Sequence, residues 1–251
     1  MRIAFLLLLC SFFQPLFGQY GITEKNNRGD FIGVNIIYAA HSPGGDLSDR
    51  FGLFFDVGLG LDYMVNNSNI IFGVDGRFFF GSRVKEDLFS TIEPDGQFIG
   101  NSRIIADVQL RQRGFYMGAY IGKLFSVLPN NKRSGIRATV GVGLLQHRIR
   151  IQQDPDSFVA QVAGEYAKGY DRLSNGLALQ EFIGYQHLSK NRLINVFAGL
   201  EMYQAFTQNR RSFNFDERRK DDMARLDLSF GFKVGITLPF YFSENPDEIY
   251  Y

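Results

Sequence analysis

The chain has no tryptophan, one cysteine, three histidines and seven prolines among its 251 residues. A single cysteine excludes a disulfide framework, and with so few histidines it also excludes a structural zinc site of the cysteine and histidine type. The 27 basic and 26 acidic side chains leave a net charge of +1, which excludes binding to nucleic acid through bulk positive charge. Aromatic residues make up 15% of the chain, so we do not expect it to be disordered.

The first 18 residues have the composition of a secretory signal peptide. Arg2 supplies a positive start, Ile3–Leu9 form a short apolar stretch, and Gly18 is a small residue at the expected cleavage site. Pro15 interrupts the apolar stretch, which disfavours a transmembrane helix. A lipoprotein anchored through Cys10 is the alternative, but a leucine precedes this cysteine where a small residue is expected.

Large apolar residues alternate with small or charged ones over long segments. Every odd position from Phe51 to Val65 is apolar, as is every even position from Leu226 to Leu238. Alternate residues of a strand point to opposite faces, so each segment is predicted to be a strand with one apolar face. No segment has the spacing of an amphipathic helix that would cover these faces. The pattern therefore predicts a sheet closed into a barrel, apolar outside and polar inside.

We count eight such segments, each long enough for the roughly 9–11 tilted residues that cross an outer membrane. They are 30–41, 51–65, 70–81, 112–127, 135–150, 176–188, 193–206 and 224–238. In the sixth, Glu181 falls on the apolar face; either a bulge shifts the phase, or the carboxylate contacts something other than lipid. The predicted fold class is all-β, an eight-stranded antiparallel up-and-down transmembrane barrel with long extracellular loops.

The connections alternate in length. Three are short (66–69, 128–134 and 189–192) and four are long (42–50, 82–111, 151–175 and 207–223). This alternation is typical of outer-membrane barrels with periplasmic turns and extracellular loops, and an even strand number puts both termini in the periplasm. We therefore expect a signal peptide at 1–18, a periplasmic segment at 19–29, the barrel at 30–238 and a periplasmic tail at 239–251. The prolines of the mature chain are all expected outside strands: Pro43, Pro94, Pro129, Pro155, Pro239 and Pro246.

Strand parity sends charged side chains of both signs to the barrel interior. The predicted lumen network consists of Asp56, Asp75, Arg77, Arg137, Glu201, Arg225, Asp227 and Lys233. An eight-stranded barrel is only wide enough to be filled by its own side chains. We interpret these groups as ion pairs that fill the lumen. A narrow channel or small-solute transporter is the alternative.

No catalytic, cofactor-binding or metal-binding residues are predicted. His41 and Ser42 offer a hydrolase-like pair, so an enzyme that modifies lipid A is the third function considered, but adjacent histidine and serine are common by chance. The last long loop carries four arginines that form a candidate surface for lipopolysaccharide phosphate or a protein partner. They are Arg210, Arg211, Arg218 and Arg219.

The signal, the strand pattern and the loops together resemble the small outer-membrane β-barrel proteins of Bacteroidota, a broad family that includes PorT-type barrels linked to type IX secretion. The resemblance is carried by Phe17-Gly18-Gln19, Gly44-Gly45-Asp46, Asp49-Arg50-Phe51-Gly52, Gly169-Tyr170-Asp171-Arg172-Leu173 and Phe206-Thr207-Gln208-Asn209-Arg210-Arg211. It implies a non-enzymatic structural or accessory subunit of an envelope machine for secretion or outer-membrane assembly. The implied partners are outer-membrane lipid, lipopolysaccharide and other envelope proteins. None of these segments is a catalytic motif, so no functional residues are carried over.

Overall fold

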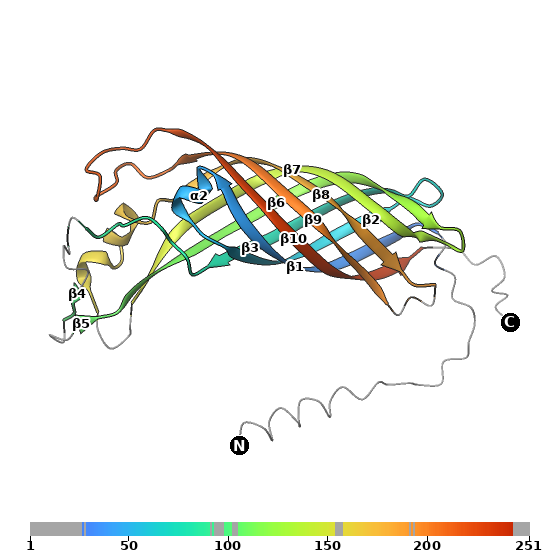
Figure 1. Cartoon of the computed structure of the whole chain (residues 1–251), viewed down its shortest axis with the longest axis horizontal. Coiled ribbons are helices and arrows are strands. Elements are labelled where there is room, and N and C mark those ends of the chain that lie inside the picture. Colours follow the sequence, from blue (N-terminus) through green and yellow to red (C-terminus); the bar gives the residue numbers. More distant parts are fainter. Residues whose placement is uncertain are drawn as a thin grey trace, which may run out of the picture.

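The computed structural model describes residues 27, 29–90, 92, 98–101, 105–153, 158–190, 192 and 194–242. The predicted signal peptide, most of the segment 19–29 and the tail beyond residue 242 lie outside these residues. Eight antiparallel strands close into a barrel in the order β1-β10-β9-β8-β7-β6-β3-β2, which confirms the prediction of an all-β, eight-stranded antiparallel up-and-down barrel. The strands are strongly tilted around the long axis (Figure 1). No helix in the described ranges is long and apolar enough to cross a membrane.

The barrel strands are β1 (Phe31–Gly45), β2 (Phe54–Met64), β3 (Ile70–Gly81), β6 (Val108–Leu128), β7 (Asn131–Gln153), β8 (Ser174–Leu188), β9 (Asn195–Asn209) and β10 (Ala224–Tyr241). The remaining elements are helix α2 (Leu47–Arg50), the two-stranded sheet β4 (Phe98–Ile99) and β5 (Ile105–Ala106), and the 3-10 helices η1 (Ala160–Val162) and η2 (Tyr166–Gly169). Figure 1 shows α2, β4 and β5 at one end of the barrel.

The two ends of the barrel differ in their connections. At the short-turn end, tight connections join β2 to β3, β6 to β7 and β8 to β9, and Phe31 pairs with Tyr241. The β2–β3 turn contains Asn67 and Asn69 at φ 64° and 52°, a left-handed conformation that asparagine tolerates better than most residues. At the opposite, long-loop end, the connections are long and carry α2, β4, β5, η1 and η2.

Several strands run further than the sequence predicts. β6 begins at Val108 and β7 ends at Gln153, so the loops on either side are shorter than expected. The prediction that prolines avoid the strands was wrong for Pro43, opposite Ser229, and for Pro239, opposite Gly33. Both lie where a strand has only one neighbour, because the β1–β2 pairing ends at His41 and the β10–β9 pairing ends at Ile236. A missing N–H is tolerated at such edge positions. The barrel accordingly ends at Tyr241 and not at residue 238.

Apolar side chains cover the outer wall of the barrel. Leu59, Leu144 and Leu200, on three different strands, are 62%, 62% and 64% exposed. The interior is filled instead of open, since Tyr116, Tyr203 and Phe79 pack as a ring cluster in the lumen. Inward glycines make room for such rings: a Cβ at Gly73 would overlap the ring of Tyr120.

Candidate functional site

The centre of the lumen holds an ion network, which we call the central cluster: His41, Asp56, Arg77, Glu201 and Lys233. Arg77 Nε on β3 donates to Asp56 Oδ1 on β2 at 2.8 Å. Its Nη2 lies 3.5 Å from Glu201 Oε2 on β9, on the opposite wall of the barrel. Lys233 Nζ donates to Glu201 Oε1 at 2.5 Å, and His41 Nε2 lies 2.7 Å from Asp56 Oδ2. Every one of these side chains is at most 9% exposed. The cluster therefore connects opposite walls of the barrel through contacts that are buried from water.

Asp75 joins the central cluster through an amide. Gln180 Nε2 on β8 donates to Asp75 Oδ2 at 3.0 Å and to Glu201 Oε1 at 2.9 Å. Tyr203 Oη lies 3.2 Å from the same nitrogen. Gln180 therefore bridges two acidic side chains that would otherwise face each other inside the barrel, where unpaired charge is costly. Nothing in the sequence singled out Gln180 for this position.

A second cluster lies nearer the short-turn end. Arg137 on β7 binds Asp62 on β2 with two nitrogens, at 2.8 and 3.2 Å, a bidentate geometry that strengthens an ion pair. Arg137 Nη1 also donates to Gln186 Oε1 at 3.0 Å, and the Tyr120 hydroxyl donates to Asp62. Because β2 and β7 lie on different sides of the barrel, this cluster spans the lumen at a second position along the barrel axis.

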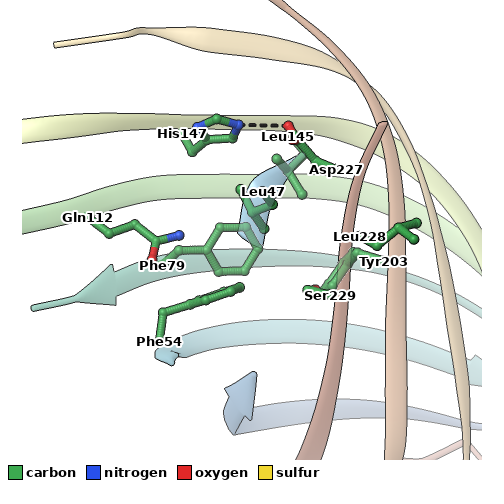
Figure 2. Close-up of a pocket in the computed structure, with 10 residues that line it drawn as sticks. All are labelled: Leu47, Phe54, Phe79, Gln112, Leu145, His147, Tyr203, Asp227, Leu228 and Ser229. Carbon is green, nitrogen blue, oxygen red and sulfur yellow. Dashed lines mark hydrogen bonds and ion pairs between the residues drawn. The ribbon is translucent and has the colours of Figure 1, made fainter. Parts of the chain in front are cut away.

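A third cluster lies nearer the long-loop end, and Figure 2 shows its His147 and Asp227. His147 Nε2 lies 2.8 Å from Asp227 Oδ2, and Thr207 Oγ1 donates to the same oxygen at 2.5 Å. Beside this pair is a cavity of about 10 Å³, lined in part by Phe54 and Phe79. A cavity of this size holds about one water molecule, so it leaves no room for an organic substrate.

Charged side chains from all four loops meet at the long-loop end, in a group that we call the cap. Arg50 Nε donates to Glu86 Oε1 at 3.1 Å, and Arg172 Nε lies 3.4 Å from Glu86 Oε2. Arg172 Nη2 contacts Asp216 Oδ2 at 2.5 Å and Glu217 Oε1 at 3.1 Å. Burial raises the pKa of Asp216, although Arg172 opposes this. Both arginines lie in segments quoted for the family resemblance, but nothing in the sequence indicated that they meet.

The structure brings most of the predicted lumen residues together, in three clusters instead of one network. Asp56, Asp75, Arg77, Glu201 and Lys233 share the centre, whereas Arg137 and Asp227 belong to the clusters on either side. Arg225 was predicted to belong to the lumen network, but it lies at the rim of the barrel. Its side chain is 21% exposed and binds Asp221 at 2.8 Å. The reason is its position near the start of β10, where an inward side chain reaches the loops and not the lumen.

The four arginines of the predicted loop surface have separate surroundings. Arg211 binds both carboxylate oxygens of Asp171, at 2.8 and 2.5 Å, and Arg219 binds Glu217 at 2.9 Å. Arg218 is exposed at a left-handed position with φ 52°. Arg210 Nε donates to Asn175 Oδ1 at 2.6 Å and is also exposed. Two of the four are therefore neutralised by carboxylates of the chain itself.

Neither a metal site nor a hydrolase site is favoured by the geometry. His41, Asp56 and Glu201 offer ligand atoms within 4.8 Å of one another, the one such group in the described part of the chain. Arg77 and Lys233 already bind these carboxylates, so a divalent cation would have to displace them. His41 points into the lumen, and Ser42, as the next residue of the same strand, points to the other face.

No protein-family model matches the chain, and no curated protein sequence matches it. Among solved structures, the barrel is similar to Neisserial surface protein A, with 13% identity and a TM-score of 0.44 over 83% of this chain and 97% of that one. It is also similar to a major outer membrane protein of Thermus thermophilus (10% identity, TM-score 0.43, 83% and 99% covered) and to Ail of Yersinia pestis (13% identity, TM-score 0.39, 84% and 99% covered). The fold described above rests on the strand pairing of this chain.

Proposed function

We propose that the protein is an integral outer-membrane β-barrel with a filled lumen, which serves as a non-enzymatic structural or accessory subunit of an envelope machine. One observation carries the membrane part of this proposal: exposed apolar side chains encircle a closed barrel whose polar groups point inward. Val57, Phe78, Met117, Val140 and Phe230 are 46%, 49%, 68%, 52% and 51% exposed. A surface of this kind needs an apolar covering, and lipid supplies it.

The difference between the two ends supports an orientation. Outer-membrane barrels have short turns on the periplasmic side and long loops outside. We therefore assign the long-loop end to the cell exterior. The short-turn end, where β1 begins and β10 ends, is assigned to the periplasm.

The lumen supports the structural role over the channel alternative. Side-chain contacts cross the interior at three levels: the ion pairs of Arg77 and Arg137, and the hydrogen bond between His147 and Asp227. Because each level joins buried side chains, a continuous water path is not favoured. The accessory role in secretion or assembly is supported by the resemblance to small barrels of Bacteroidota. The charged cap also suits it, since it holds the loops in one arrangement that a partner protein can recognise.

The membrane proposal is tested by placing a charge on the outer wall. Val57→Arg or Phe230→Arg should lower the free energy of unfolding in lipid vesicles by about 2–4 kcal/mol, the cost of arginine near the bilayer midplane. Ser90→Arg, in an exposed part of a long loop, is the matched control and should change little. The measurement is urea unfolding, followed by loss of the faster gel mobility of the folded barrel. Equal tolerance at Val57 and Ser90 would contradict a lipid-facing wall.

The accessory role is tested by purification of the barrel from native outer membrane in a mild detergent. We expect a second envelope protein to remain bound in a fixed ratio. Recovery of the barrel alone, still folded, would contradict a role as a machine subunit and would leave the membrane assignment intact.

A further inference from the structure

We infer that the outer wall of the β6–β7 hairpin at the long-loop end binds the phosphate groups of outer-leaflet lipid. Four arginines form this site, which we call the arginine patch: Arg111, Arg113, Arg148 and Arg150. The inference rests on the proposed membrane location and adds a ligand class and a position. None of these four residues is among the loop arginines that the sequence singled out.

The four side chains share one face of two paired strands. Arg111 lies directly opposite Arg150, and Arg113 lies directly opposite Arg148. Along β6 the odd residues face outward, as the 42% exposure of Phe115 shows, and along β7 the even residues do, as the 62% exposure of Leu144 shows. The strands thus place two rows of paired arginines on the outer wall.

This arrangement leaves positive charge uncompensated. Like charges directly opposite each other destabilise a sheet. No carboxylate of the described residues lies within 4 Å of these four guanidinium groups, whereas Arg50, Arg77, Arg137, Arg172 and Arg211 all have one. Among the described residues, the hydrogen bonds of the patch are to neutral groups: Arg111 Nη2 donates to Gln109 Oε1 at 2.5 Å and Arg113 Nη1 to the Gln112 carbonyl at 2.7 Å. The carboxylate of Asp107 accepts from Gln109 Nε2, at 2.8 Å, and is reached by the patch only through that amide. An anion from outside the described chain would relieve the repulsion.

The position of the patch along the barrel axis indicates which anion it binds. Successive outward pairs read Met117 with Leu144, Phe115 with Gln146, and then the two arginine pairs. The arginines therefore begin directly above the apolar belt, beyond an aromatic ring of the kind that lies at a membrane interface. Lipid phosphates occupy this height in a bilayer, and guanidinium groups bind phosphate with paired hydrogen bonds.

A series of hydrogen bonds between polar side chains on the same outer wall extends the patch. Asn175 Nδ2 on β8 donates to Gln146 Oε1 at 3.4 Å, and Arg210 Nε donates to Asn175 Oδ1 at 2.6 Å. Arg210 is exposed, so a fifth guanidinium follows the arginine rows around the barrel. A row that follows the wall fits headgroups packed side by side in a leaflet better than one small soluble anion.

The test compares two double variants in vesicles. Arg113→Gln with Arg148→Gln removes the lower pair of the patch. Lys168→Gln with Lys220→Gln removes two exposed charges from the loops at the same end of the barrel, with side chains 52% and 62% exposed, and is the matched control. Each protein is reconstituted in phosphatidylcholine with bis-phosphorylated or dephosphorylated lipid A, purified in mild detergent and assayed for retained lipid A by native mass spectrometry.

We expect the wild type and the control to retain the phosphorylated lipid. The patch variant should retain at least about tenfold less of this lipid, since charge-assisted hydrogen bonds to phosphate are lost. Equal retention by the patch variant, equal retention of dephosphorylated lipid, or displacement by millimolar inorganic phosphate would overturn the inference. Insertion of the wild type into vesicles of phosphatidylcholine alone separates the two proposals. Failure to insert refutes the membrane location. Insertion, with lipid A retention that does not depend on the phosphates of the lipid, refutes only the lipid site.

Discussion

Arg77 stabilises the charged interior of the barrel by neutralising two buried carboxylates. Its guanidinium contacts Asp56 beside it and Glu201 across the barrel. Arg77→Ala would leave Asp56 with a hydrogen bond to His41 in place of its ion pair, and would remove a contact between opposite walls of the barrel. Loss of one partner from a buried ion pair costs about 3–5 kcal/mol.

Arg77→Ala should therefore lower the temperature at which the folded barrel loses its faster gel mobility. Arg219→Ala, in an exposed loop position, is the control and should leave that temperature unchanged. If both variants melt with the wild type, the interior is hydrated and the central cluster does not stabilise the fold.

Asp30, just before β1, gives a prediction about pH. The backbone N–H of Asn66 donates to Asp30 Oδ1 at 2.5 Å, and the Tyr63 hydroxyl donates to Oδ2 at 2.8 Å. These hydrogen bonds, that from Asn66 above all, hold the pKa of Asp30 below its usual 3.8. A lowered pKa in the folded state stabilises the fold above pH 3.8, and this contribution disappears as the pH falls through the folded-state value.

Urea unfolding of the wild type and of Asp30→Asn, measured from about pH 6 down to about pH 2.5, checks this expectation. The wild type should be more stable at the upper end of this range, and the difference should shrink below pH 3.8. A difference that stays constant over the whole range would show that the charge of Asp30 does not contribute.

At the scale of strands, the alternating pattern predicted the cores of all eight strands but not their ends. The reason is physical: apolar alternation marks the part of a strand whose outer face needs an apolar covering. Backbone pairing continues beyond that part. In β6 and β7 the outward residues change from Met117 and Leu144 to Arg113 and Arg148, yet the strands stay paired as far as Val108 and Gln153.

Glu181 decides between the two interpretations that the sequence left open. The pairing of β8 with β7 and with β9 runs without a shift through this residue, so the bulge hypothesis was wrong. The carboxylate lies on the outer wall, half-buried, and Glu181 Oε1 accepts a hydrogen bond from Gln204 Nε2 at 3.3 Å. The amide of Gln204 on the neighbouring strand partly satisfies a group that lipid would not solvate.

Glu181→Leu should raise the free energy of unfolding in lipid vesicles by about 1–2 kcal/mol, since an acidic group on the lipid face is unfavourable. Ile183→Leu, two residues along the same face, is the control for a change of shape alone. A loss of stability in Glu181→Leu would mean that the carboxylate binds another protein in the membrane.

At the scale of the whole molecule, the sequence predicts which side chains enter the lumen but not which of them meet. Parity assigns Arg77 and Glu201 to the interior, but their contact depends on how the closed barrel staggers β3 against β9. The cap was beyond prediction for a similar reason, because Arg50, Glu86, Arg172 and Asp216 come from four loops. Glycine and asparagine patterns predict turns, whereas contacts between distant loops follow only from the closed fold.

The orientation of the barrel predicts a protease pattern. Trypsin added to intact cells should cleave after the exposed residues Arg218, Arg219 or Lys220 at the long-loop end. It should spare Lys132 and Lys190, which are also exposed but lie at the short-turn end, until the outer membrane is permeabilised. Cleavage at Lys190 in intact cells would reverse the orientation.

The three lumen clusters and the cap together predict that the barrel does not conduct ions. Each cluster crosses the interior at its own level, so removal of one leaves the others in place. The wild type, Arg77→Ala and the cap variant Arg172→Ala should therefore all be silent in planar bilayers, while a general porin in the same lipid gives conductance steps. Arg77→Ala is the sharpest case, because it should lose thermal stability without opening a path. Discrete steps from the wild type would show that water fills the lumen, and the channel alternative would then replace the structural role.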